Sequence, residues 1–183
     1  MFHLVEDPDD EAAEAFTEAL DLEPDNHVVL HKLLGTYQAA ERWSEAIDVI
    51  ERVADLDTRD EAKAKYTYTI CVILRDKLED EDAALERFNT ALDLDSSQLK
   101  PFEAVNKILN TRKDWKALER AYRKMLHRII NQGNTDLEHN LWHTLGIIYR
   151  DRQRNFDAAA EAFKMAASLK PDDFLAVCSA ANA

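Results

Sequence analysis

Glycine and proline are scarce in this sequence of 183 residues, which contains 3 Gly and 4 Pro. β-Sandwiches and β-barrels need many turns, and those turns depend on residues that tolerate positive φ or fix φ. So few turn residues argue against both architectures, while abundant Ala, Leu, Glu, Asp, Lys and Arg favour helices. The composition therefore predicts an all-α fold, in which Gly133, within Asn-Gln-Gly-Asn at 131–134, is a predicted helix stop with positive φ.

Cysteine is equally rare, and long apolar runs are missing. Cys71 and Cys178 lie far apart and form no C-x-x-C pair, so neither a disulfide framework nor a zinc ribbon is expected. No window approaches the ~18 uncharged apolar residues that a membrane span requires, and the first residues lack the basic start and apolar stretch of a signal peptide. We therefore expect a soluble, cytoplasmic chain with no membrane partner.

Positive charge is also in short supply, with 23 Lys and Arg against 36 Asp and Glu and a formal net charge of −13. A field of this sign repels phosphate groups, which disfavours nucleic acids and anionic lipids as partners. The charge is unevenly divided, because residues 1–91 carry 9 basic and 24 acidic side chains, whereas residues 92–183 carry 14 and 12. The chain thus has a strongly acidic N-terminal half.

The sequence repeats itself internally. When the segment at residues 67–96 is laid on the segment 75 residues later, the two match without a gap. The matched positions include Arg75-Asp76 with Arg150-Asp151 and Phe88 with Phe163. A gapless match of this kind indicates a structural repeat.

Five sets of apolar residues follow one pattern in the second helix that we expect for each repeat. A small or aliphatic residue is followed four places later by a large one, and three places after that by another apolar residue. This spacing puts all three on one helical face. The sets are Ala12/Phe16/Ala19, Ala46/Ile50/Val53, Ala84/Phe88/Ala91, Leu118/Tyr122/Met125 and Ala159/Phe163/Ala166. Their first members are 34 to 41 residues apart, which fits two helices and two turns per repeat.

One stretch resembles the tetratricopeptide repeat signature nearly position by position: Trp142, Leu145, Gly146 and Tyr149, followed by Ala159, Phe163, Ala166 and Pro171. The resemblance implies a right-handed α-solenoid of antiparallel helix pairs, with about four repeats plus flanking half-repeats in a single array over residues 1–183. The expected bounds are 9–24 for a half-repeat, 27–58, 60–96, 98–133 and 136–171 for the repeats, and 173–183 for the start of a further helix. The half-repeats at both ends suggest a segment of a longer protein.

In this family, the first helices of successive repeats line an inner wall that holds peptides or partner helices. The resemblance therefore implies a binding groove, whose positions carry over to His31, Gln38, Lys65, Tyr68, Arg75, Lys100, Glu103, Lys107, Asn140, His143 and Arg150. Most of these side chains are basic or aromatic although the chain is acidic, which favours a protein or peptide ligand with acidic groups or a free carboxylate. The alternative is a structural spacer or self-association module within a larger protein.

Other groups of residues in the sequence give little support for catalysis or metal binding. His139 and His143 are four residues apart on one predicted helix, but no third metal ligand accompanies them. Cys71 falls at a core position, where burial keeps a thiol inert. A basic stripe lacks the interleaved aromatic side chains on which nucleic-acid bases stack; its members are Arg120, Arg123, Lys124, His127 and Arg128. We expect no enzyme activity, metal, cofactor or nucleic-acid partner.

Overall fold

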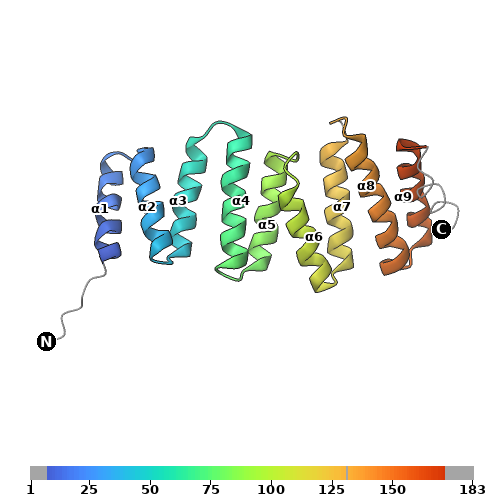
Figure 1. Cartoon of the computed structure of the whole chain (residues 1–183), viewed down its shortest axis with the longest axis horizontal. Helices are drawn as coiled ribbons and strands as arrows, with labels where there is room; N and C mark the ends of the chain where they lie inside the picture. Colours follow the sequence, from blue (N-terminus) through green and yellow to red (C-terminus); the bar gives the residue numbers. More distant parts are fainter. Residues whose placement is uncertain (1–7, 131, 172–183) are drawn as a thin grey trace. The chain divides into compact units, whose positions relative to one another are not determined.

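The computed structural model of the chain describes residues 8–130 and 132–171 and divides the chain into two compact units, Met1–Asp95 and Ser96–Ala183. Every regular element in the described residues is helical, so the fold is an all-α solenoid of helical hairpins (Figure 1). This confirms the predicted fold class, while the single array over residues 1–183 stays a prediction. The further helix expected at 173–183 and Cys178 lie outside the described residues.

In the N-terminal unit, neighbouring helices lie side by side and alternate in direction (Figure 1). The described helices of this unit are α1 (Pro8–Leu22), α2 (His27–Ala39), α3 (Trp43–Leu56), α4 (Asp60–Asp76) and α5 (Glu81–Leu94). α2 and α3 lie within the expected repeat 27–58, and α4 and α5 lie within the expected repeat 60–96. The first helices of these two hairpins are therefore α2 and α4.

The C-terminal unit contains α6 (Lys100–Arg112), α7 (Trp115–Ile129), α8 (Thr135–Ile147), η1 (Ile148–Gln153) and α9 (Phe156–Leu169). α8 continues directly into η1, a π-helical segment that the sequence did not predict. Such segments insert a residue into the helical ladder and often occur at functional sites. The first helices of the two hairpins in this unit are α6 and α8.

Short polar side chains start many of the helices. The carboxylate or amide oxygens of Asn26, Asp80, Asp114, Asn134 and Asn155 each accept a hydrogen bond from a backbone N–H two or three residues later. These bonds satisfy donors that have no partner within the helix. The sequence pattern therefore fixes where these helices begin.

The turns inside the hairpins share a conformation that the sequence did not reveal. Each first helix is followed by a non-glycine residue with φ between 54° and 56°, and these residues are Glu41, Glu79, Lys113 and Arg154. A left-handed conformation costs a residue with a Cβ about 1–2 kcal/mol, so packing of the paired helices must impose it. Gly133, with φ of 73°, confirms the predicted helix stop between the two hairpins of the C-terminal unit.

The apolar stripes form the core as predicted in four of the five sets. Their members are buried on α3, α5, α7 and α9, and Phe88 and Phe163 are fully buried. On α1 the predicted set is wrong by about one residue, because Ala13 and Leu20 are the buried positions and Phe16 is partly buried. The reason is tertiary: α1 turns toward the core that it shares with Leu30 on α2 and with α3.

Gly146 shows why the last repeat needs a glycine on its first helix. A Cβ placed on Gly146 would lie 2.5–2.9 Å from three ring carbons of Phe163. Cβ atoms do not tolerate such contacts, so a larger residue would displace a buried ring. The absence of a side chain on α8 therefore lets α9 approach closely.

Candidate protein-interaction surfaces

The predicted inner-wall residues of the N-terminal unit all lie on its first helices, α2 and α4. His31, Gln38 and Lys65 are exposed, whereas Tyr68 and Arg75 are half-buried. The ring centroids of Tyr68 and Phe88 are 6.0 Å apart, and the Arg75 guanidinium carbon lies 6.0 Å from the Phe88 centroid. The structure thus places Tyr68 and Arg75 around the buried phenylalanine of the following helix.

The predicted residues of the C-terminal unit are divided between α6 and the α8–η1 segment. Lys100, Glu103, Lys107 and Asn140 are exposed, and His143 and Arg150 are half-buried. The ring centroids of His143 and Phe163 are 5.5 Å apart, and the Arg150 guanidinium carbon also lies 5.5 Å from the Phe163 centroid. Two hairpins, one in each unit, therefore present the same arrangement, as the gapless match at 75 residues implies.

Acidic neighbours offset much of the positive charge that the sequence placed on this wall. Arg75 donates two hydrogen bonds to the Asp76 carboxylate, at 2.6 and 2.8 Å, and Arg150 donates two to Asp151, at 2.8 and 3.3 Å. Hydrogen bonds from Arg150 lower the pKa of Asp151, so that carboxylate stays ionised. The Lys65 ammonium group lies 2.8 Å from the Glu61 carboxylate. Each acidic partner is only one or four residues away in the sequence, but the expected basic wall did not include these local pairs.

Lys100 and Lys107 differ from the other basic positions of the wall. Both are exposed on α6, and within the described residues neither makes an ion pair or hydrogen bond through its ammonium group. Glu103 lies between them on the same helix. The strongest available positive charge on the predicted wall is therefore on α6.

The π-helical segment is tied to α7 through Glu119, a residue that sequence analysis did not single out. One Glu119 carboxylate oxygen accepts a hydrogen bond from the Tyr149 hydroxyl at 3.0 Å, and the other accepts one from the Gln153 amide at 3.2 Å. Burial acts to raise the pKa of Glu119, but hydrogen bonds from Gln153, Tyr149 and Arg123 outweigh burial and lower it. Glu119 thus holds η1, at the end of the predicted inner wall, against α7 as a charged acceptor.

The paired histidines are part of the packing of this unit. His139 is buried, its Nδ1 lies 3.0 Å from the carbonyl oxygen of Ala166, and its ring stacks on His143 at 6.3 Å between centroids. Across residues 8–130 and 132–171, no group of three His, Cys, Asp or Glu side chains is arranged to hold a metal ion. Cys71 is buried, and burial raises the pKa of its thiol to about 12.

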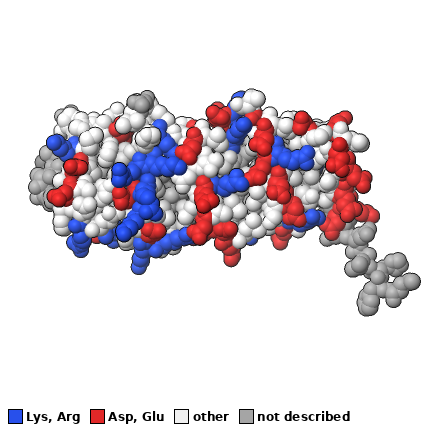
Figure 2. Space-filling model, turned by 180° about the vertical axis from the view of Figure 1, so that it is seen from behind, with Lys and Arg blue, Asp and Glu red and all other residues white. Residues whose placement is uncertain are grey.

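Charge is divided between the two units. The N-terminal unit carries 26 acidic and 9 basic residues, and the C-terminal unit carries 10 and 14. Figure 2 shows Lys and Arg side chains gathered over the C-terminal unit on the face turned toward the viewer. The predicted basic stripe on α7 lies in this unit, where Arg120, Arg123, Lys124 and His127 are exposed.

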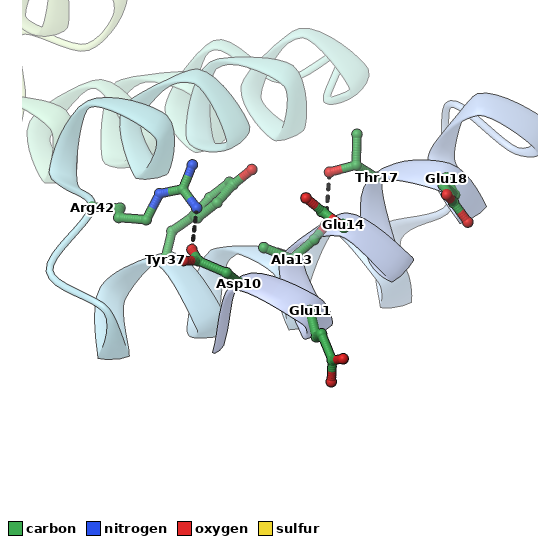
Figure 3. Close-up of a pocket in the computed structure, with 8 residues that line it drawn as sticks. All are labelled: Asp10, Glu11, Ala13, Glu14, Thr17, Glu18, Tyr37 and Arg42. Atoms are coloured by element: carbon green, nitrogen blue, oxygen red, sulfur yellow. Dashed lines mark hydrogen bonds and ion pairs between the residues drawn. The ribbon is translucent and has the colours of Figure 1, made fainter. Parts of the chain in front are cut away.

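A cleft of about 520 Å³ lies between α1 and the end of α2 in the N-terminal unit (Figure 3). The sequence does not predict this surface, because its residues come from two helices and from the turn after α2 and share no motif. The lining residues are Asp10, Glu11, Ala13, Glu14, Thr17, Glu18, Tyr37 and Arg42. The cleft combines carboxylates on α1 with an aromatic ring and one guanidinium on the opposite side.

Comparison with known proteins agrees with this architecture. Sequence profiles described as tetratricopeptide repeat match residues 10–67 and 139–173. Helical hairpins with buried small–large–small stripes define a class of repeat proteins, and α5, α6 and α7 continue the helical pattern between the two matched stretches. The chain belongs to the tetratricopeptide repeat family.

Solved structures show the same fold at low sequence identity. The N-terminal domain of stress-induced protein-1 (STI-1) from C. elegans has a TM-score of 0.52 and 14% identity, covering 69% of this chain and 98% of that domain. The C-terminal part of a TPR repeat-containing protein from Cytophaga hutchinsonii has a TM-score of 0.50 and 18% identity, covering 95% of this chain and 64% of that one. At these identities the likeness supports the fold alone.

No curated protein sequence matches the chain significantly. In the described residues, no helix is long and apolar enough to cross a bilayer.

Proposed function

We propose that this chain is a non-catalytic scaffold that binds an acidic or carboxylate-bearing peptide of a partner protein on the inner wall of its C-terminal unit. Tetratricopeptide repeats act as protein-interaction scaffolds, and the family assignment supports this general role. The finer proposal depends on one observation, the pair Lys100 and Lys107. These ammonium groups are exposed on the first helix of a hairpin and form no ion pair or hydrogen bond with the described residues around them.

The other inner-wall residues of this unit suit recognition by shape and hydrogen bonding more than by charge. Asn140 is exposed and offers both a donor and an acceptor. The His143 ring and the Arg150 guanidinium both rest against Phe163, so their positions are restrained by packing. Restrained side chains lose little entropy when a ligand binds, which favours binding at such positions.

Charge reversal on α6 tests this function. The variant Lys100→Glu/Lys107→Glu is compared with Lys116→Glu/Lys164→Glu, which changes the net charge equally on exposed positions of α7 and α9. An acidic peptide with a free C-terminal carboxylate should bind the α6 variant roughly tenfold or more weakly than the native chain. The control variant should keep most of the affinity, and circular dichroism must show that both variants fold. An equal loss of affinity in both variants would show that binding depends on net charge alone and would refute a site on α6.

The charge division between the units favours a second candidate function, self-association of acidic and basic surfaces on different copies. Interactions of this kind weaken as salt screens them, over a Debye length of about 8–10 Å near physiological ionic strength. Sedimentation velocity at several protein and salt concentrations tests this candidate. Mass that rises with protein concentration and falls with salt would support it, and a constant monomer mass would refute it.

A further inference from the structure

The cleft between α1 and α2 already holds one cation, the guanidinium of Arg42. This group lies 4.8 Å from the centroid of the Tyr37 ring and 2.8 Å from the Asp10 carboxylate. It also binds Glu45 at 2.9 Å, and hydrogen bonding to Glu45 raises the pKa of Arg42. The cleft therefore shows how its aromatic ring and its carboxylates together accommodate a positive charge.

Arg42 does not neutralise the whole cleft. Within the described residues, the carboxylates of Glu11, Glu14 and Glu18 form no ion pair or hydrogen bond. In Figure 3, Glu14 and Thr17 lie across the cleft from Tyr37 and Arg42, while Glu11 points away. An excess of negative charge thus remains on the α1 side of the cleft.

This excess is unfavourable for α1 itself. Glu14 and Glu18 are separated by four residues, and Glu11 and Glu14 by three, so like charges are neighbours on the helix surface. The last turn of α1 has no basic residue to compensate the helix dipole. A cationic ligand along this face would relieve both effects.

The cleft has the composition of a docking surface for a basic segment, and its volume is about 520 Å³. Half-buried Tyr37 supplies apolar surface in the cleft. Glu14 and Glu18 are both exposed on α1. Charge complementarity identifies the occupant as basic.

We infer that the α1–α2 cleft binds an amphipathic helix of a partner protein, in which Lys or Arg residues four positions apart face Glu14 and Glu18. This inference deepens the proposed scaffold function and rests on it, but it concerns a different surface and a ligand of opposite charge. The aliphatic stems of the basic side chains pack on Tyr37, while their charged ends reach the carboxylates. The scaffold then engages basic segments at its N-terminal unit and acidic segments at its C-terminal unit.

Binding of a synthetic helix to the full chain tests the inference. The probe is a fluorescent Ala- and Gln-based peptide with the 15-residue length of α1, carrying Lys or Arg at positions i, i+4 and i+8. A second peptide has the same composition with its basic residues distributed around the helix, and a third has Glu at the same positions. Fluorescence anisotropy at low ionic strength gives the dissociation constants.

The test variant is Glu14→Gln/Glu18→Gln, and the matched control is Asp48→Asn/Glu86→Gln. Both remove two negative charges from exposed positions of the same unit, but the control positions do not line the cleft. Loss of two ion pairs should weaken the probe roughly five- to thirtyfold in the test variant. The control variant should change the affinity by less than about twofold.

Three outcomes would overturn the inference. The test and control variants could lose affinity for the probe equally, or the peptide with rearranged basic residues could bind as tightly as the probe. Either result would show that binding depends on net charge alone and not on the cleft. Alternatively, the native chain could dimerise and the Glu14→Gln/Glu18→Gln variant could stay monomeric, which would make a second copy the occupant. Because the acidic-peptide test uses other residues and another ligand, failure here is distinguishable from failure of the proposed function.

Discussion

The contact between Phe163 and Gly146 allows a quantitative prediction about the last hairpin. Phe163 is fully buried on α9, and its ring fills the space left by the missing side chain of Gly146 on α8. Truncation by Phe163→Ala removes the ring and leaves a cavity, which we expect to lower the free energy of unfolding by roughly 3–5 kcal/mol. The matched change Phe156→Ala should cost much less, because Phe156 is 49% exposed.

A double-mutant cycle sharpens this prediction. In the native background, Gly146→Ala forces a methyl group to within 2.9 Å of the ring and should cost roughly 1–3 kcal/mol. In the Phe163→Ala background the ring is gone, so the same methyl group enters the cavity and brings the better helix propensity of alanine. Gly146→Ala should therefore become neutral or stabilising there, and the coupling between the two sites should exceed about 1 kcal/mol.

Urea denaturation followed by circular dichroism measures all four proteins of this cycle. The midpoint and slope give each free energy of unfolding, and Phe156→Ala reports the cost of losing an exposed phenylalanine. The reasoning would be refuted if Phe163→Ala were no less stable than Phe156→Ala. Additive effects of the two substitutions would show that Gly146 does not serve to admit the ring.

Two further predictions concern titratable groups. Glu119→Gln weakens the hydrogen bonds from Tyr149 and Gln153 and should lower the free energy of unfolding by about 1–3 kcal/mol at neutral pH. Because the folded pKa of Glu119 is lowered, the stability that its carboxylate contributes is present above the usual pKa of 4.5 and is lost below it. Urea titrations should therefore show the stabilities of the native chain and the variant converging in acid. Burial raises the pKa of the Cys71 thiol to about 12. In the Cys178→Ala variant, Cys71 should therefore resist a thiol reagent at about pH 8 while the protein is folded, and react once urea unfolds the protein. Rapid labelling of the folded protein would contradict the burial of Cys71.

The repeat register predicted which helices carry the expected wall residues, but not which of their side chains pair locally. Positions such as Tyr68 and His143 followed from the repeat register, and the structure places both on first helices next to a buried phenylalanine. The expected basic character did not allow for the carboxylate that each of Arg75 and Arg150 binds. Whether an adjacent aspartate pairs with an arginine depends on side-chain conformation, which spacing alone does not specify.

The α1–α2 cleft could not be predicted from the sequence, for a related reason. Its acidic residues looked like an ordinary solvated helix face, and its aromatic wall, Tyr37, belongs to a different helix. Their relation depends on how α1 packs, and here the predicted face was wrong by about one residue. A rotation of that size changes which carboxylates face a neighbouring helix.

The sequence by itself determined the helical composition, the repeat, the caps at Asn26 and Asp80, and four of the five buried stripes, because each depends on local propensity or on a periodicity of a single helix. The tertiary structure alone decided the left-handed turns without glycine, the π-helical end of α8, the Glu119 hydrogen bonds and the cleft. These features depend on contacts between helices, which can impose local conformations that isolated residues avoid.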